Sequence, residues 1–527
     1  MKITKISFIF PLSIALSLSL ISLMLGQDTN GDVWNYHWYN AWAFLNDRLN
    51  YDIAPAGAHS YLNPYLDTIY YYSITHLRAK AHALLFGFIQ GLVAFPIFYI
   101  VRKHVSEILL STILTILCTF GSTFFIGELG QSMQDNSAAL LILTSLAFIY
   151  RSVENDDIKS LSFAALIIGV ATGLKLTSST YLISFGVISL IFIKKNLKDK
   201  LFVILIYTIF SLTGMLASTG HWFYGLYESF GNPIFPFYNN IFKSSFASLD
   251  ANATRHMFFF QQKGIENLFY PFFFAEHTDK ISSAANAGRF VLYTPLIIFI
   301  ISPIALLLRI NEIGIKKIVT DKFFFLFILF FASYFIWQKA FGVYRYFIPN
   351  DLLNPLIIYL SLGVIFKSLP SKPSRYLYLA MTLTTIMVGL NFSKGIPTWG
   401  RGEMTNPYFS GNIPNDLKSS DVLFTFSNPS GWILPIIQPK GHVVGLGDML
   451  FNYGTDKYWM IYQNFTNNIE QPKQYAIFDE AQHIDYELAN KKLDRFGLKL
   501  DRPNCRNFNV KMSSFIGKQL YCPVIRK

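Results

Sequence analysis

Residues 31–45 read Gly31-Asp32-Val33-Trp34-Asn35-Tyr36-His37-Trp38-Tyr39-Asn40-Ala41-Trp42-Ala43-Phe44-Leu45. Written as a helix, this stretch places Trp34, Trp38 and Trp42 on one face as an aromatic stripe. Because tryptophan favours the membrane–water interface, we expect the helix to lie flat on the outer surface of a bilayer. Asp32 comes just before the helix, where a carboxylate can cap exposed N–H groups or act as a general base at the lipid boundary.

The rest of the chain has the composition of a membrane protein. Hydrophobic residues make up 52% of its 527 residues and charged residues only 14%, whereas soluble domains carry about 25% charged residues. Crossing about 30 Å of hydrocarbon takes about 20 apolar residues. We therefore predict a polytopic all-α membrane protein with about eleven transmembrane helices, at 6–26, 81–101, 107–126, 136–150, 160–174, 178–193, 201–219, 290–308, 323–338, 347–366 and 377–391.

The basic residues predict orientation in the membrane rather than binding to nucleic acid, although the net charge is +12. They gather in the short connections Arg102-Lys103, Lys194-Lys195-Asn196-Leu197-Lys198, Lys316-Lys317 and Lys367 with Lys372 and Arg375. Lys and Arg mark cytoplasmic loops. We expect an inner-membrane protein with a cytoplasmic N-terminus and long outer loops at 27–80 and 220–289.

The first apolar run has a second interpretation as a cleaved signal peptide. It is long for such a segment, and no A-x-A-like cleavage site precedes Gln27. We expect an uncleaved span. The second outer loop is rich in aromatic residues, such as Phe258-Phe259-Phe260 and Phe272-Phe273-Phe274, which favours interfacial helices and packed turns on the bilayer surface.

Polarity rises after residue 391, so residues 392–527 are expected to form a small soluble α/β accessory domain on the non-cytoplasmic side. Its strands are predicted at 421–426, 443–446 and 475–479. Cys505 and Cys522 both lie in this domain, and an oxidising compartment would allow them to form a disulfide. Cys118 lies inside a predicted span and is expected to be inert.

Further polar residues lie at the ends of the predicted spans. Four segments contain most of them: Gly127-Glu128-Leu129-Gly130-Gln131-Ser132-Met133-Gln134-Asp135, Gly173-Leu174-Lys175-Leu176-Thr177, Gly231-Asn232-Pro233-Ile234-Phe235-Pro236-Phe237-Tyr238-Asn239 and Tyr344-Arg345-Tyr346-Phe347-Ile348-Pro349. The predicted topology brings six charged residues to the outer boundary of the membrane: Asp32, Glu128, Asp135, Lys175, Arg289 and Arg345. This convergence predicts a site there, although polar residues gather at span ends in any membrane protein.

An acid soon after the first span, a long first outer loop and these ordered segments together resemble the GT-C superfamily of integral membrane glycosyltransferases, in an uncharacterised bacterial branch. The resemblance covers residues 1–391. It implies a GT-C-like fold and transfer of a sugar from a polyprenyl-phosphate donor. It also implies that the first-loop acid is the catalytic base; here this is Asp32, with Asp28 as the fallback.

The resemblance extends to other residues. Superfamily members often place a second acid where Glu128 and Asp135 stand, and Arg345 matches an element that meets the donor phosphate. We expect Lys175 or Arg289 to assist Arg345, because a fixed cation stabilises phosphate charge and arginine can bond two phosphate oxygens. Substrate or lipid contacts are expected from four aromatic or histidine side chains: Tyr36, His59, Tyr344 and Tyr346.

The sequence therefore predicts an inverting glycosyltransferase that works at the outer face of the membrane. Its expected partners are a polyprenyl-phosphate sugar, the bilayer and a glycan, lipid or protein acceptor. No cofactor is expected; a divalent cation held by Asp32, Asp135 and Glu128 is the less favoured alternative. Two other functions stay open: an O-antigen-type polymerase or ligase that uses diphosphate-linked glycans, and a polytopic transporter or flippase, although charges near the bilayer midplane and repeated halves are not visible.

Overall fold

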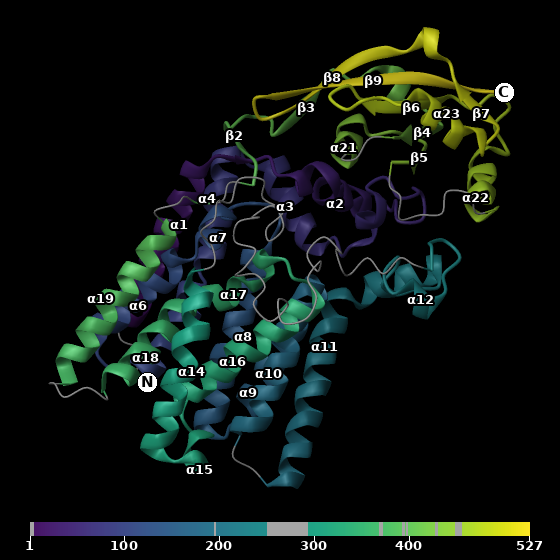
Figure 1. Cartoon of the computed structure of the whole chain (residues 1–527). Coiled ribbons are helices and arrows are strands. Elements are labelled where there is room, and N and C mark those ends of the chain that lie inside the picture. Colours follow the sequence, from purple (N-terminus) through teal and green to yellow (C-terminus); the bar gives the residue numbers. More distant parts are fainter. Residues whose placement is uncertain are drawn as a thin grey trace.

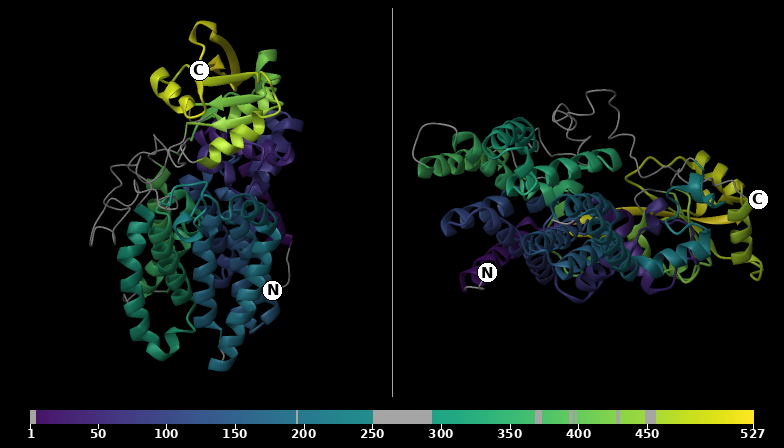
Figure 2. Two further views of the ribbon diagram at one scale, coloured as in Figure 1. Left: turned by 90° about the vertical axis from the view of Figure 1, so that its right-hand side faces the viewer. Right: turned by 90° about the horizontal axis from the view of Figure 1, so that it is seen from below.

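A computed structural model describes residues 5–193, 196–249, 293–367, 373–392, 396, 399–426, 430–447 and 456–527. It consists of a bundle of long helices with a sheet domain at one end, and a layer formed by the first outer loop lies between the two (Figure 1). The C-terminus lies in the sheet domain, and the N-terminus lies in the bundle away from it (Figures 1 and 2).

The bundle confirms a multi-pass membrane protein. Among the described residues, six helical segments are long and apolar enough to cross a membrane: α1 (Lys5–Leu25), α4 with α5 (Ala79–Gly91 and Ala94–His104), α8 (Asp135–Asn155), α11 (Leu197–Phe230), α14 (Tyr293–Ile313) and α16 (Lys322–Ala340). A seventh candidate bends by 52° between η7 with α17 (Tyr344–Phe347 and Ile348–Asp351) and α18 (Asn354–Lys367).

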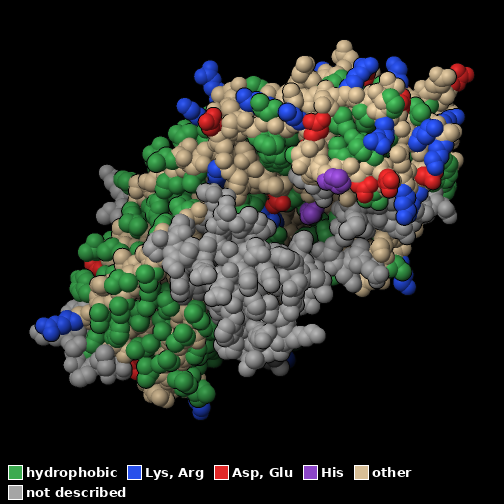
Figure 3. All heavy atoms as spheres, turned by 45° about the horizontal axis from the view of Figure 1, so that its top comes forward, with side chains coloured by type: hydrophobic (Ala, Val, Ile, Leu, Met, Phe, Trp, Pro, Cys, Tyr) green, Lys and Arg blue, Asp and Glu red, His purple; other side chains and the backbone are tan. Residues whose placement is uncertain are grey.

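Four shorter apolar helices complete the bundle: α6 (Ile108–Gly121), α9 (Ile158–Leu174), α10 (Ser179–Phe192) and α19 (Pro373–Phe392). The short helices α7 (Thr123–Gly127) and α15 (Ile315–Ile318) connect longer ones. Apolar side chains cover the face of the bundle seen in Figure 3, whereas Lys and Arg gather over the sheet domain. The predicted number of eleven spans stays a prediction.

Helix α11 departs from its predicted bounds. The predicted span ended at residue 219, but the helix continues to Phe230. Its 34 residues extend roughly 50 Å, which exceeds the hydrocarbon thickness. Hydropathy cannot detect a helix that continues in the polar region. Of the predicted interfacial segments beyond it, α12 (Asn239–Phe242) is seen, while residues 258–260 and 272–274 lie outside the described residues.

The C-terminal domain contains a seven-stranded mixed sheet in the order β3-β8-β9-β6-β4-β5, with β7 paired to β9. The strands are β3 (Phe409–Gly411), β4 (Val422–Thr425), β5 (His442–Gly445), β6 (Gln474–Asp479), β7 (Leu498–Leu500), β8 (Arg506–Met512) and β9 (Phe515–Arg526). Strands β4, β5 and β6 match the three predicted strands and run parallel. The helices of the domain are α20 (Asn415–Lys418), α21 (Leu434–Ile437), α22 (Asp456–Thr466) and α23 (Tyr486–Asp494).

The aromatic stripe of the first outer loop packs against other parts of the protein. It lies on η1 (Val33–His37), a π-helical turn, and α2 (Trp38–Leu45). Trp34 packs on Trp432 of the sheet domain, with ring centroids 5.1 Å apart. Trp34 is half-buried, whereas Trp38 and Trp42 are buried. The expectation that this stripe anchors the helix in the membrane interface is therefore wrong, because a periodic aromatic face fits a protein partner as well as lipid headgroups.

Two short pairings fasten the outer loop to the domain. Ile53 extends the sheet at β5, since its N–H donates to the Val443 carbonyl and its carbonyl accepts from Gly445 N–H. At the other end, β1 (Gln27–Asp28) pairs with β2 (Arg401–Gly402). The remaining helices of the loop are η2 (Gly57–Tyr61) and α3 (Tyr65–His76).

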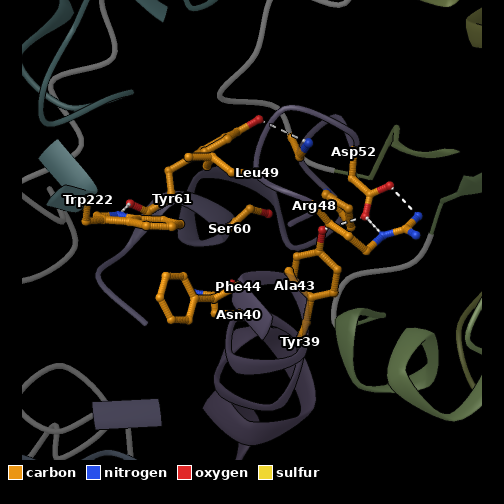
Figure 4. A pocket seen from close by; sticks show the side chains of 12 residues that line it. Tyr39, Asn40, Ala43, Phe44, Arg48, Leu49, Asp52, Ser60, Tyr61 and Trp222 are labelled. Carbon is orange, nitrogen blue, oxygen red and sulfur yellow. Dashed lines mark hydrogen bonds and ion pairs between the residues drawn. The ribbon is translucent and has the colours of Figure 1, made fainter. Parts of the chain in front are cut away.

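A buried ion pair beside these contacts forms a clamp, which we define as Arg48 with Asp52. The guanidinium donates to both carboxylate oxygens, over 2.6 and 2.7 Å, and also to the Gly441 carbonyl of the sheet domain. Asp52 accepts from Tyr39 and from Val443 N–H, each over 2.9 Å. Figure 4 shows Arg48, Asp52 and Tyr39 at one side of a small cavity. Both members of the clamp therefore bind the sheet domain, Arg48 as a donor and Asp52 as an acceptor.

Candidate active site

Asp32 and Arg345, which are separated by 313 residues, meet at the end of the bundle that faces the sheet domain. The Arg345 Nη1 donates to Asp32 Oδ2 over 2.9 Å. Asp32 is not used as a helix cap, because the side chain of Asn30 accepts the N–H groups of Asp32 and Val33. Burial alone would raise the pKa of Asp32, but the charge and hydrogen bond of Arg345 outweigh it and lower this pKa to about 2.

A second acid and a second cation join this pair. Asp135, the first residue of α8, lies 2.6 Å from the Lys175 Nζ and 3.6 Å from the Arg345 Nε. Lys175 follows the end of α9 and also donates to the Met133 carbonyl. Arg345 thus stands between two carboxylates. The four side chains lie in or next to four helical segments (η1, α8, α9 and η7) and form a single charged cluster.

Glu128 binds the backbone at the residue that begins α8, next to this cluster. Its Oε1 accepts the N–H of Asp135 over 2.6 Å and that of Asn136 over 3.3 Å, while its buried Oε2 has no partner among the described residues. Burial and the nearby Asp135 raise the pKa of Glu128 to about 8. The raised pKa favours the protonated form of Glu128, and its Oε1 fixes the start of α8.

A small cavity opens beside the cluster. Asp135, Arg345 and Tyr346 supply its polar wall. The remaining lining residues are Ala138, Ile142, Thr177, Ser178, Tyr181 and Pro349. Within the described part of the chain, the buried Arg345 Nε and Ser178 Oγ have no hydrogen-bond partner. The Tyr346 ring centre lies 5.3 Å from the Arg345 guanidinium carbon and 5.7 Å from the Lys175 Nζ. Arg345, with Lys175 close by, therefore places cationic groups beside the apolar wall of this small cavity.

Two of the predicted contact residues lie near Asp32. Tyr36 is on the π-helical turn, and burial together with the charge of Asp32 raises its pKa well above the ordinary value. The His59 ring stacks on Tyr36 with centroids 4.9 Å apart. Tyr344, in contrast, points into the helical core, where its hydroxyl donates to Asp351 over 2.9 Å. Arg289 lies outside the described residues.

Asp28, the fallback acid, is hydrogen-bonded to neighbouring segments through both carboxylate oxygens. Its carboxylate accepts from Asn30, from the Ser132 N–H over 2.7 Å and from the Tyr70 hydroxyl over 3.0 Å. These bonds tie the first outer loop to the loop before α8. Because its oxygens are already engaged and it is buried, Asp28 holds the site in place. No group of three or more His, Cys, Asp or Glu within the described ranges could hold a metal ion.

One pair of residues was not predicted from the sequence. The Nδ1 of His37 lies 2.7 Å from the Asp67 Oδ1, and both side chains are buried. Burial raises the pKa of Asp67, although His37 acts against this shift. Asp67 belongs to α3, thirty residues from His37, so no local spacing signals the pair. The one available hint was a histidine five positions after the candidate acid.

Comparisons with known proteins identify the fold. No protein-family model and no curated protein match the chain. The crystal structure of ArnT from Cupriavidus metallidurans bound to undecaprenyl phosphate is similar over 98% of both chains, with a TM-score of 0.50 and 12% identity. The chain has the ArnT fold. The apo ArnT structure matches 98% of this chain and 97% of its own, also with 12% identity, at a TM-score of 0.41.

The likeness to ArnT concerns the fold, and it agrees with the architecture that we expected from the sequence. The match spans both the helical bundle and the C-terminal domain, since it covers almost the whole chain. The sequence motifs had supported the resemblance only for residues 1–391. The sheet domain is therefore part of the shared architecture rather than an unrelated addition.

Proposed function

We propose that this protein is an inverting glycosyltransferase that moves a sugar from a polyprenyl-phosphate donor to an acceptor hydroxyl at the outer face of an inner membrane. The observation that carries the proposal is the Asp32–Arg345 pair, 2.9 Å long, beside the cavity that Arg345 and Asp135 line. The crystallised ArnT with the same fold was bound to undecaprenyl phosphate, which is a ligand of the chemistry that this cavity suits.

In the proposed reaction the donor phosphate binds to Arg345, assisted by Lys175, while the lipid follows the apolar wall of the cavity. A phosphate competes with Asp32 for the guanidinium. Because Arg345 is what holds the pKa of Asp32 near 2, donor binding makes Asp32 more basic. The acid is thereby activated only when a donor is present.

Asp32 then takes the proton of the acceptor hydroxyl while the hydroxyl oxygen attacks the anomeric carbon. The bond from that carbon to the phosphate oxygen breaks, and its electron pair leaves on the phosphate. The cations stabilise this developing charge, an effect that is worth several kcal/mol at fixed sites. A positioned base typically contributes about 10²–10⁴-fold.

The test is the Asp32→Asn variant, purified in detergent and assayed with a labelled polyprenyl-phosphate sugar. We expect its kcat to fall by at least about 100-fold, since an amide cannot accept the proton. The control is Asp47→Asn in the same outer loop. Asp47 is exposed and has a positive φ of 53°, which asparagine tolerates, so this control should keep wild-type activity.

Undiminished transfer by Asp32→Asn would remove Asp32 from the mechanism. The donor assay also separates the proposal from its enzymatic alternative. Turnover of a diphosphate-linked glycan without turnover of a monophosphate sugar would contradict the proposed donor class.

A further inference from the structure

The π-helical turn η1 places a histidine beside the candidate acid. In an α-helix, a residue five positions along the chain faces away from the first. A π-turn closes its hydrogen bonds over five residues, so His37 comes round to the side of Asp32. The two groups are close enough that His37 lowers the pKa of Asp32. Single π-turns within helices often occur at functional sites.

His37 is held in one orientation with one nitrogen to spare. Asp67 bonds its Nδ1 over 2.7 Å, which fixes the ring. The Nε2 is buried and has no partner among the residues that the structure describes. A carboxylate on Nδ1 with a free Nε2 is the arrangement in which a histidine accepts a proton, because the carboxylate stabilises the imidazolium that forms.

We propose that the His37–Asp67 dyad, the second proton-handling group of the site, receives the acceptor's proton from Asp32. This proposal rests on the proposed function and adds a step to it. After the sugar is transferred, Asp32 carries the hydroxyl proton. Its carboxylic O–H bond breaks as a new N–H bond forms at His37 Nε2, and the lone pair of that nitrogen supplies the electrons. The imidazolium later releases the proton to water.

Two steps of the cycle make this transfer useful. Departure of polyprenyl phosphate frees Arg345, which re-forms its ion pair only with an ionised Asp32. Because Asp32 is a strong acid when it faces Arg345, the proton moves readily to a group of higher basicity. Imidazole titrates near neutral pH, so His37 is a stronger base than a carboxylate paired with arginine.

Charged and titratable side chains lie near the dyad on each element that surrounds it, and they all contribute to the pH dependence of sugar transfer. They are Asp32 and Tyr36 on its own segment, His59 on η2, Asp67 on α3, Lys175 after α9 and, through Asp32, Arg345 on η7. Of these, Asp67 alone makes a hydrogen bond to His37 that the structure describes.

The experiment measures the pH profile of sugar transfer by purified full-length protein with a labelled polyprenyl-phosphate sugar. A dyad that accepts a proton must be neutral first, so wild-type kcat should rise with pH along an acidic limb. We expect His37→Gln to lose this limb and to lower kcat by at least about tenfold, with the donor KM changed less than twofold. The donor is bound by Arg345, which the change does not touch.

Asp67→Asn tests the dyad without removing the ring. The amide keeps a hydrogen bond to Nδ1 but no longer stabilises the imidazolium, so the acidic limb should move to lower pH. A purely structural role for Asp67 would not move it. His82→Gln is the matched control. His82 is also buried, with Nδ1 bonded over 2.8 Å to Ser73 Oγ and with Nε2 lacking a partner within the described residues. This variant should keep the wild-type profile.

Each outcome decides the proposal. If wild-type protein transfers sugar and His37→Gln keeps both kcat and the acidic limb, the dyad is excluded while the proposed function stands. If His37→Gln fails to fold, Asp67→Asn decides, and an unmoved limb overturns the proposal. If wild-type protein transfers no sugar from a polyprenyl-phosphate donor, the proposed function and the dyad fall together.

Discussion

Glu128 links the site to stability through a single proton. Burial and Asp135 raise its pKa from an ordinary 4.5 to about 8, so between these values the folded protein keeps a proton that the unfolded chain releases. Stability therefore falls as pH rises through this window. We expect the Tm of detergent-purified protein to drop between pH 5 and pH 8.5 (roughly the limits set by the two pKa values), and the drop to flatten in Glu128→Gln.

Glutamine is a close mimic of the protonated acid here. Its oxygen can still accept from Asp135 and Asn136, as Glu128 Oε1 does, and its amide replaces the protonated oxygen. The exposed Glu480 provides a matched Glu→Gln control, which should leave the pH dependence of Tm as it is in the wild type. A Glu128→Gln protein whose Tm followed pH as steeply as the wild type would disprove the assignment.

Single residues were only partly predictable from the sequence. Asp32 and Arg345 were predicted, because each lies at a span end in a recognisable segment, and the structure places them 2.9 Å apart. Tyr344 was expected beside them but points into the core, since neighbours in a tight turn face opposite ways. His37 and Asp67 were missed because their pairing depends on how α3 folds back on η1, which no local pattern encodes.

At the scale of elements, the Arg48–Asp52 clamp holds the outer loop against the sheet domain. Both charges are buried, so removing one leaves the other uncompensated. We expect Arg48→Met to destabilise the protein by about 3–5 kcal/mol, measured as a fall in Tm and as faster proteolysis of the sheet domain. The double variant Arg48→Met/Asp52→Asn should recover part of this loss, because no buried charge remains.

An exposed pair in the same domain is the control for the clamp. Arg506 and Asp416 lie 3.9 Å apart with both side chains largely in water, and such pairs contribute about 0–1 kcal/mol. Arg506→Met should therefore change the Tm little. If Arg48→Met were equally mild, or if the double variant were less stable than Arg48→Met, the clamp would not hold the loop against the domain as its geometry indicates.

Helices and strands were predicted where apolar residues form a long run or recur at a regular spacing in the sequence. The apolar runs located the bundle helices, and three parallel strands of the domain were recognised. Strand β8 alternates polar and apolar residues over Asn507-Phe508-Asn509-Val510-Lys511-Met512, and its buried residues follow this alternation. This period of two is typical of a strand, but the strand was not among those predicted. The π-turn η1 was not predictable, because its five residues have no pattern that separates it from an α-helix.

At the scale of the whole molecule, the bundle and the sheet domain together have the fold of ArnT. The side of the membrane that each part faces is predicted only from the Lys and Arg residues in the short loops. The cysteines allow a direct test. The chain has three: Cys118 is buried and free, and Cys505 is joined to Cys522 in the sheet domain. If that domain faces the oxidising outer side, the bond should persist in cells.

We therefore expect a membrane-impermeant maleimide to label the protein in intact spheroplasts only after an impermeant reductant has been added. The Cys505→Ser/Cys522→Ser variant should stay unlabelled under both conditions, and Cys118→Ser should behave as the wild type. Labelling that instead requires the membrane to be permeabilised would place the sheet domain in the cytoplasm. Asp32 and Arg345 lie at the same end of the bundle as that domain, so such a result would also move the proposed sugar transfer to the cytoplasmic face.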